Sequence, residues 1–325
     1  MKLDFHKDHR LLFAVILGGY VALTVLIAAE PALWVNAHNA PLPGSTPLAA
    51  DEARGLGVYV SEGCLYCHTQ QVRPLPQDHS FGRPSVPADY ARLAWLDLWR
   101  APPAVLGSER TGPDLSDAGD RQPSATWQYI HLYAPRAVVP WSVMAAFPWL
   151  FRVERQPGPD AVVVPVPAPY APQGGKVVAT PRAQALIAYL LSLKQLPLPG
   201  AATSAVAPSV ATAGASLYAS RCATCHQENG RGLPSAFPSL VGDRAVTAGD
   251  GVEHIRIVLF GLQGGAIGGV AYAGEMPAWG QQLSDDEIAA VINYERTSWG
   301  NRAPTVTPAD VAAVRRQGPQ GGRRP

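Results

Sequence analysis

Residues 64–68 read Cys-Leu-Tyr-Cys-His, and residues 222–226 read Cys-Ala-Thr-Cys-His. These two motifs hold all four cysteines of the chain: Cys64, Cys67, Cys222 and Cys225. No cysteine is left over for a disulfide or a zinc site. The Cys-x-x-Cys-His spacing is the attachment signature of c-type haem, in which both thiols become covalently linked and the histidine binds the iron. The sequence therefore predicts two covalently attached haem c groups, with His68 and His226 as proximal iron ligands.

The methionines follow the same arrangement. The chain has three, and apart from the first residue each follows one motif: Met144 the first and Met276 the second. A thioether opposite the histidine completes a six-coordinate iron and raises its potential, which suits electron transfer and leaves no open position for a substrate. The alternative is that both methionines only fill core space. We predict that Met144 and Met276 are the distal ligands.

The N-terminus carries a membrane signal. Residues 11–29 contain no charged side chain, and a helix of that length, at about 1.5 Å per residue, spans roughly the 30 Å hydrocarbon layer. Lys2, Lys7 and Arg10 precede the run, which predicts a cytoplasmic N-terminus and an exported remainder. A cleaved signal peptide is the alternative, but its apolar region is normally shorter. We expect a retained single-pass anchor in the inner membrane of a bacterium, with the haem domains in the periplasm.

Composition and patterning divide the chain. Its 325 residues exceed one ordinary domain, and the net charge of +1 names no partner and gives no reason to expect nucleic acid. An apolar stripe after Thr180 and a capping box at Ser284 and Glu287 predict a closing helix for each of two domains. The region 155–176 is predicted as a hairpin or a loop. The expected segments are an anchor (1–30), a tether (31–47), a first domain (48–195), a linker (196–212), a second domain (213–301) and a mobile tail (302–325).

From Tyr59 to Leu150 the sequence resembles subunit II of cbb3-type cytochrome c oxidases, the membrane-anchored monohaem subunit. Four stretches carry the resemblance: EGCLYCHTQQVRP at 62–74, RTGPDL at 110–115, HLYAPRAVVP at 131–140 and FPWL at 147–150. The resemblance implies that His68 and Met144 ligate the first haem. The sequence departs from the family pattern where Ala145, instead of proline, follows Met144. It also departs where a second domain follows the first.

The second domain resembles small class I c-type cytochromes, through MPAWG at 276–280 and SWGN at 298–301. Such domains occur in the oxidase family's separate dihaem subunit and in cytochrome subunits of quinoprotein alcohol dehydrogenases. The expected fold is all-α: an N-terminal transmembrane helix followed by two cytochrome c-like domains. By the same resemblance, the carbonyls of Pro113 and Pro238 are expected to accept a hydrogen bond from the proximal histidines.

Other residues have two interpretations each. Arg110, Arg121 and Arg136 are candidates for holding haem propionates, because an arginine fork matches a carboxylate, or they are solvated surface residues. His131 is an alternative distal ligand to Met144, or a hydrogen-bonded core histidine. A glycine group is expected to let the backbone run close to the haem: Gly261, Gly264, Gly265, Gly268 and Gly269.

These observations predict a dihaem electron-transfer subunit of a cbb3-type terminal oxidase. A periplasmic donor such as soluble cytochrome c would load the second haem, and electrons would pass through the first haem to a catalytic haem–copper subunit. One membrane helix cannot supply the intramembrane histidines of an oxygen-reducing centre, so no such centre is expected in this chain. Two alternatives remain: an anchored dihaem relay serving a periplasmic dehydrogenase, and a dihaem peroxidase with an open iron position.

Overall fold

The computed structural model describes residues 7–38, 40, 45–95, 105–195, 210–262, 266–267 and 270–319. The chain separates into two compact units. The first comprises residues 1–49 and 86–104, and the second comprises residues 50–85 and 105–325. The predicted linker falls mostly outside the described residues, as do four of the glycines singled out from the sequence: Gly264, Gly265, Gly268 and Gly269.

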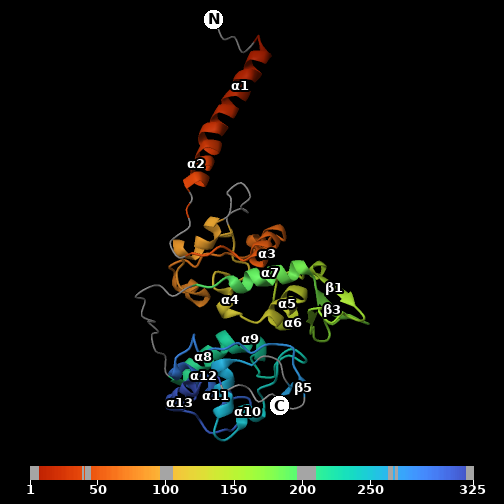
Figure 1. The fold of residues 1–325 in the computed structure, drawn as a ribbon, viewed down its shortest axis with the longest axis vertical. Coiled ribbons are helices and arrows are strands. Elements are labelled where there is room, and N and C mark those ends of the chain that lie inside the picture. Colours follow the sequence, from red (N-terminus) through yellow and green to blue (C-terminus); the bar gives the residue numbers. More distant parts are fainter. Residues whose placement is uncertain are drawn as a thin grey trace. The chain divides into compact units, whose positions relative to one another are not determined.

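The first unit contains a continuous apolar helix made of α1 (His9–Thr24), a π-helical turn (Val25–Ala29) and α2 (Glu30–His38) (Figure 1). Its mean hydropathy reaches 2.6, and none of its most apolar window is buried against the protein. The helix continues past the predicted start of the tether at residue 31. Pro31 has no N–H to donate, and the π-helical turn just before it already departs from the regular hydrogen-bond ladder.

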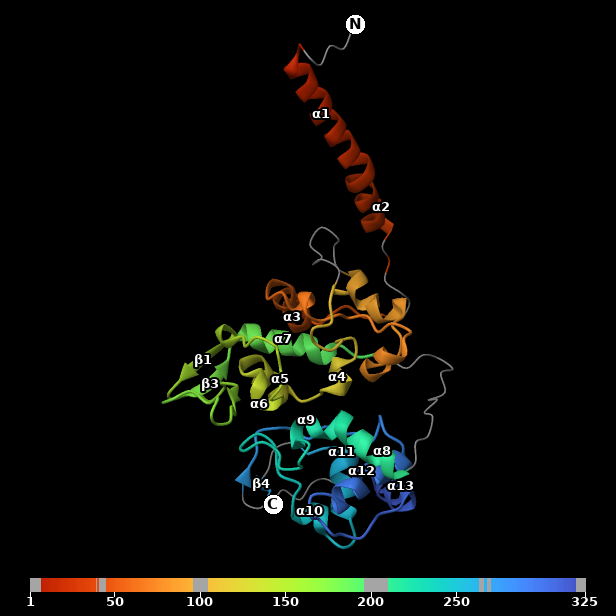
Figure 2. The same cartoon turned by 180° about the vertical axis from the view of Figure 1, so that it is seen from behind.

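The first domain of the second unit is built on α3 (Ala50–Ser61) and α7 (Pro181–Ser192), which lie side by side in Figures 1 and 2. The predicted start of α7 is confirmed, because the Thr180 hydroxyl accepts a hydrogen bond from the Ala183 amide. A Cβ added to Gly55 would lie 1.9 Å from the carbonyl oxygen of Ala185. The two helices therefore touch through their backbones at this point.

Short elements connect these helices. The helical ones are a 3-10 turn at Cys64–Tyr66, a 3-10 helix at Pro76–Phe81, α4 (Ala118–Arg121), α5 (Ala125–Tyr133), α6 (Pro135–Val138) and a 3-10 turn at Pro148–Leu150. A further 3-10 helix, Pro87–Trp95, belongs to the first unit. The strands are β1 (Phe151–Glu154), β2 (Val163–Val164) and β3 (Lys176–Ala179).

The region 155–176, predicted as a hairpin or loop, is part of a small sheet: it connects β1 to β3 and contains β2. Its order is β1-β3-β2 with antiparallel pairing, and Phe151 lies opposite Ala179. Including the second domain, the structure is 51% helix and 6% strand. The fold is therefore mostly helical, and not all-α as predicted. The difference arises because a valine-rich segment pairs into strands, in which β-branched residues pack well.

The second domain contains α8 (Val210–Leu217), a π-helical turn (Tyr218–Cys222), α9 (Ala223–His226), α10 (Arg244–Thr247), α11 (Val252–Phe260), β4 (Ala266–Ile267), β5 (Val270–Ala271), α12 (Asp285–Thr297) and α13 (Pro308–Gln317). Figure 2 shows α8, α11, α12 and α13 gathered together. The capping box predicted at Ser284 and Glu287 is present. Gly214 repeats the role of Gly55, since its added Cβ would lie 2.3 Å from the carbonyl oxygen of Ala290 in α12.

The end of the chain differs from the predicted mobile tail, because residues 308–317 form the packed helix α13. Thr307 and Asp310 make a capping box at its start, and Val311 and Val314 are buried in the core of the second domain. The Arg315 side chain donates to the Asp285 carboxylate over 2.8 Å. The sequence contains the helix-start signal Thr-Pro-x-Asp at 307–310. The apolar stripe of α13 is short, and the many Pro, Gly and Arg residues around it indicated a mobile segment instead.

Gly55→Ala is expected to destabilise the first domain by about 1–3 kcal/mol, because the new methyl group overlaps the backbone of α7. Gly57→Ala is the matched control in the same helix. An added Cβ there meets nothing within 4 Å, so this change should be neutral or stabilise by up to about 1 kcal/mol through helix propensity. Denaturant unfolding of the haem-loaded chain measures both. Equal effects of the two substitutions would contradict the close helix contact.

Candidate haem-binding sites

A cavity lies in the first domain, with about 660 Å³ of space between its lining atoms when the part that opens to solvent is counted. It brings together residues far apart in the sequence, including Cys64, His68, His131 and Met144. Its apolar walls come from Tyr59, Leu115, Ala118, Trp127, Leu132, Leu186 and Leu190. Cys64 and His68 of the first motif therefore meet Met144 at one apolar cavity, whereas Cys67 is exposed and is not among the lining residues.

The backbone orients the His68 ring. His68 Nδ1 lies 2.8 Å from the carbonyl oxygen of Pro113, in the arrangement expected from the resemblance. Gly112 lies against the ring, since a Cβ at this position would be 2.2 Å from His68 Cε1. A carbonyl on Nδ1 fixes the tautomer and leaves Nε2 for a metal.

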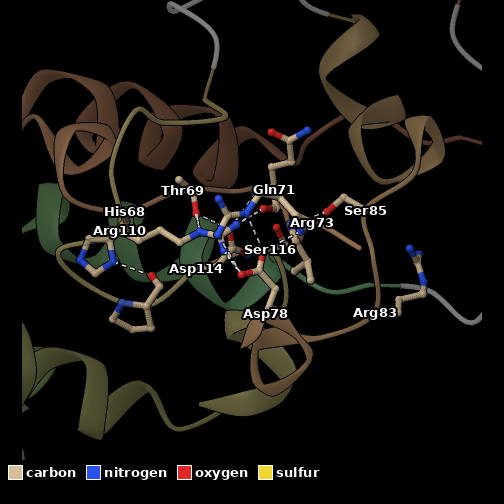
Figure 3. Close-up of polar contacts among 12 residues, drawn as sticks. His68, Thr69, Gln71, Arg73, Asp78, Arg83, Ser85, Arg110, Asp114 and Ser116 are labelled. Atoms are coloured by element: carbon tan, nitrogen blue, oxygen red, sulfur yellow. Dashed lines mark hydrogen bonds and ion pairs between the residues drawn. The ribbon is translucent and has the colours of Figure 1, made fainter. Parts of the chain in front are cut away.

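A buried carboxylate holds the Pro113 segment in place (Figure 3). Asp114 Oδ2 accepts hydrogen bonds from the backbone N–H of Gln71, over 2.8 Å, and from the Thr69 hydroxyl. Asp114 Oδ1 accepts a hydrogen bond from the backbone N–H of Ser116 over 2.8 Å. The Leu115 amide donates to the Thr69 carbonyl over 2.8 Å. These bonds fasten the residues after the haem motif to those that present the proline carbonyl.

Two arginines and a second buried carboxylate extend this network (Figure 3). Arg73 Nε donates to Asp78 Oδ2 over 2.9 Å, and Arg110 forms ion pairs with Asp78 and Asp114. The Asp78 side chain is only 1% exposed. Hydrogen bonds from Arg73, and then from Arg110, hold the pKa of Asp78 well below its usual range.

The three candidate arginines lie in different surroundings. Arg110 is bound within the carboxylate network, and the exposed Arg136 is not among the cavity-lining residues. Arg121 does line the cavity, and its buried Nε has no hydrogen-bond partner among the described residues. Arg121 is therefore the arginine that could pair with a haem propionate at this cavity. Arg110 instead positions the loop around Pro113.

His131 and Met144 both line the first cavity, so both candidate distal ligands are present. The His131 ring stacks on the Trp127 indole, with centroids 4.6 Å apart and planes 13° apart. Burial, with a smaller contribution from His68, lowers the pKa of His131 to about 4, so the ring is neutral at neutral pH.

The second domain also has a cavity, with about 1010 Å³ of space between its lining atoms when the part that opens to solvent is counted. Cys222, Cys225, His226 and Met276 all line it. His226 Nδ1 lies 3.0 Å from the carbonyl oxygen of Pro238, which repeats the geometry of the first site. The Met276 segment is fixed by paired backbone bonds to Leu262, of 2.8 and 2.9 Å.

A buried acid–base pair also faces the second cavity. His254 Nε2 lies 2.7 Å from Glu295 Oε2, and each residue is less than 5% exposed. His254 Nδ1 is buried without a hydrogen-bond partner in the described part of the chain. No sequence pattern predicts this pair, because its members lie 41 residues apart and share no motif.

The chemistry of both cavities fits covalently attached haem. Burial raises the pKa of Cys64 and of Cys225 to about 12, so both side chains are neutral thiols at neutral pH in the chain without its cofactor. Among the described residues, no group of three or more His, Cys, Asp or Glu side chains could hold a metal ion directly. Apolar walls, an oriented histidine, a methionine and unpartnered polar nitrogens together match a porphyrin with its propionates.

Comparison with known families agrees with this division of the chain. Residues 4–159 match the family described as "Cytochrome C oxidase, mono-heme subunit/FixO". Residues 209–294 match the family described as "Cytochrome C oxidase, cbb3-type, subunit III".

Individual relatives match parts of the chain. Cytochrome c-552 of Thermus thermophilus is 40% identical over 126 residues, covering 32% of this chain and 95% of the relative. The cytochrome c subunit of a quinone alcohol dehydrogenase from Gluconacetobacter polyoxogenes is 38% identical over 106 residues, which cover 32% of this chain but 23% of the relative. The cbb3-type oxidase subunit FixP of Azorhizobium caulinodans is 34% identical over 90 residues, covering 27% of each chain.

The fold and the paired cavities define a c-type cytochrome: a mostly helical protein whose two domains are of the cytochrome c type. The chain joins a region that matches the FixO-type monohaem subunits to a cytochrome domain that matches subunit III of cbb3-type cytochrome c oxidases. Such domains transfer electrons and carry covalently bound haem c.

Asp78→Asn is expected to lower stability at neutral pH, because it removes a carboxylate that Arg73 and Arg110 bind. The depressed pKa of Asp78 contributes stability above the unfolded value of about 3.9, and this contribution is lost as the pH falls below it. The stability difference between wild type and variant should therefore narrow below about pH 4. Denaturant midpoints at several pH values test this. Asp51→Asn, at a side chain 66% exposed, is the control and should change little.

Met144→Leu is expected to abolish the sulfur-to-iron charge-transfer band of one ferric haem and to lower its potential, because leucine offers no ligand. His131→Gln should leave that band in place. Optical spectra and redox titration of the haem-loaded variants measure both effects. If Met144→Leu leaves the band and the potential unchanged while His131→Gln shifts the potential of that haem, the distal position belongs to His131.

Proposed function

We propose that this chain is a dihaem electron-transfer subunit of a cbb3-type terminal oxidase, passing electrons from a periplasmic donor to the catalytic haem–copper subunit. The observation that carries the proposal is the repeated site. Each domain brings one Cys-x-x-Cys-His motif, a proline carbonyl on the histidine and one methionine to one apolar cavity. The match of the first region to the FixO family supports the oxidase assignment.

In this proposal each domain holds one haem c, attached through Cys64 and Cys67 in the first and through Cys222 and Cys225 in the second. Haem c supplies reversible one-electron chemistry at its iron. His68 and Met144 ligate the first iron, and His226 and Met276 ligate the second. Pro113 and Pro238 orient the histidines, and Arg121 neutralises propionate charge at the first site.

The apolar helix His9–His38 is proposed to anchor the chain in the inner membrane, with the N-terminus in the cytoplasm and both domains in the periplasm. Its length and mean hydropathy support a span, and Lys7 and Arg10 lie at its start, as the positive-inside rule expects. A soluble cytochrome c is the proposed donor. This arrangement would keep the haem domains beside the catalytic subunit.

One alternative has its own support. Cytochrome subunits of alcohol, gluconate and fructose dehydrogenases match part of the chain at 34–39% identity. A relay serving a periplasmic dehydrogenase would use the same two sites, with electrons leaving the dehydrogenase. Each of these matches covers only 23–24% of the dehydrogenase subunit.

Purification of the tagged chain from native membranes tests the proposal. We expect two c haems per chain by mass and haem assay, together with a many-helix partner that carries b haems. The double substitution Cys64→Ser with Cys67→Ser should reduce the covalently attached haem from two groups to one, and Cys222→Ser with Cys225→Ser should do the same in the other domain. A co-purifying dehydrogenase without b haems would favour the alternative, and a resting high-spin ferric haem would favour a peroxidase.

A further inference from the structure

The first turn of α5 carries polar side chains that are buried although they lie at the edge of the first domain. Ser124 is 1% exposed and Thr126 is 9% exposed. Both are buried against the second domain. The Ser124 hydroxyl donates to Glu275 Oε2 over 3.3 Å, and the Thr126 hydroxyl donates to the Ala273 carbonyl over 3.2 Å.

Trp127, in the same turn, makes a third contact with the second domain. Its indole Nε1 donates to the backbone carbonyl of Thr224 over 3.1 Å. The side chain is only 7% exposed, and its other face stacks on His131. One aromatic ring thus touches the wall of the first cavity and the backbone of the second domain.

The partners of this turn are functionally placed. Thr224 lies between the two cysteines of the motif at 222–226, next to Cys225. Ala273 and Glu275 lie just before Met276. The turn therefore contacts both the segment that attaches the second haem and the segment that leads to its sulfur ligand.

The two cavities also share a wall. Gln122, Pro123 and Ser124 of the first domain line the second cavity, and Gln122 lines the first cavity as well. The Gln122 carbonyl accepts from Gln128 Nε2 over 3.2 Å, which ties this segment to α5. The first domain thus closes part of the second cavity.

We propose that residues 122–127 form the electron route between the two haem sites, with Trp127 as the bridging residue. The inference rests on the proposed dihaem relay and deepens it. The step moves one electron from the reduced iron at one site to the oxidised iron at the other, with no bond made or broken and no proton moved. The reductant is the periplasmic donor of that proposal.

The physical reason is continuity. An electron tunnels more readily through bonded and hydrogen-bonded atoms than across a gap between separate domains. The indole N–H reaches the carbonyl of Thr224, which is one peptide bond from Cys225, and Cys225 is a proposed point of covalent attachment. On the other side Trp127 itself lines the first cavity. The bridge therefore needs only one side chain.

The test uses the full haem-loaded chain in detergent, in a Met144→His background. Only the second haem then keeps a sulfur ligand, so the far-red sulfur-to-iron band reports that site alone. A photoexcited ruthenium complex injects electrons at sub-stoichiometric amounts, and the decay of the ferric band follows transfer from the first site to the second. Trp127→Phe, which keeps a ring but loses the N–H donor, should slow this phase several-fold, and Trp127→Leu should slow it further.

Trp149→Phe is the matched control, because this exposed indole of the first domain donates to Glu62 and lines neither cavity. Its transfer rate should equal that of the background chain. Unchanged rates in both Trp127 variants would overturn the route. With Trp127 intact the rate should not depend on solvent viscosity, and a rate that falls as viscosity rises would show that the domains must first dock, which also overturns it.

The Met144→His substitution distinguishes a failure of the electron route from a failure of the proposed dihaem relay. If Met144→His leaves the far-red band intensity of the starting chain unchanged, then Met144 is not a ligand and the dihaem site assignment fails. If the band falls but the Trp127 variants transfer normally, only the route fails.

Discussion

Both cytochrome domains depend on one close contact between the helix that precedes the Cys-x-x-Cys-His motif and the helix that follows the methionine. In each domain a glycine of the earlier helix lies directly against a backbone carbonyl of the later one: Gly55 of α3 against Ala185 of α7, and Gly214 of α8 against Ala290 of α12. A side chain at either glycine would force the helices apart. Since α3 and α8 each lead into a Cys-x-x-Cys-His motif, this contact also sets where the residues of the motif lie relative to α7 and α12.

The two domains fix the proline carbonyl on the histidine by different means. The first uses charge: Asp78 and Asp114 are buried with Arg110, and the ion pairs tie the loop after the motif to the Pro113 segment. Such a network is costly to break, because removing one partner leaves a buried charge without compensation.

The second domain relies on neutral carbonyl acceptors. Arg296, which is fully buried, donates to the carbonyls of Val246, Ala248 and Pro304 over 2.7–2.8 Å. Asn301 donates to the Leu240 carbonyl and accepts from the Gly242 amide. These bonds hold the loops that follow Pro238. The same contact between a histidine and a proline carbonyl is therefore supported by two unrelated sets of polar contacts.

The sequence by itself determined the cofactor chemistry, because a covalent motif is local: two thiols and a histidine within five residues need no tertiary information. It also determined the helix starts at Thr180 and Ser284, since capping depends on residues three apart. It could not separate the roles of Arg110, Arg121 and Arg136, because which guanidinium reaches a cavity depends on how distant loops fold together. The pair His254 and Glu295, the packed helix α13 and the contact of Trp127 with Thr224 were likewise decided only by tertiary structure, since each joins residues that no short spacing connects.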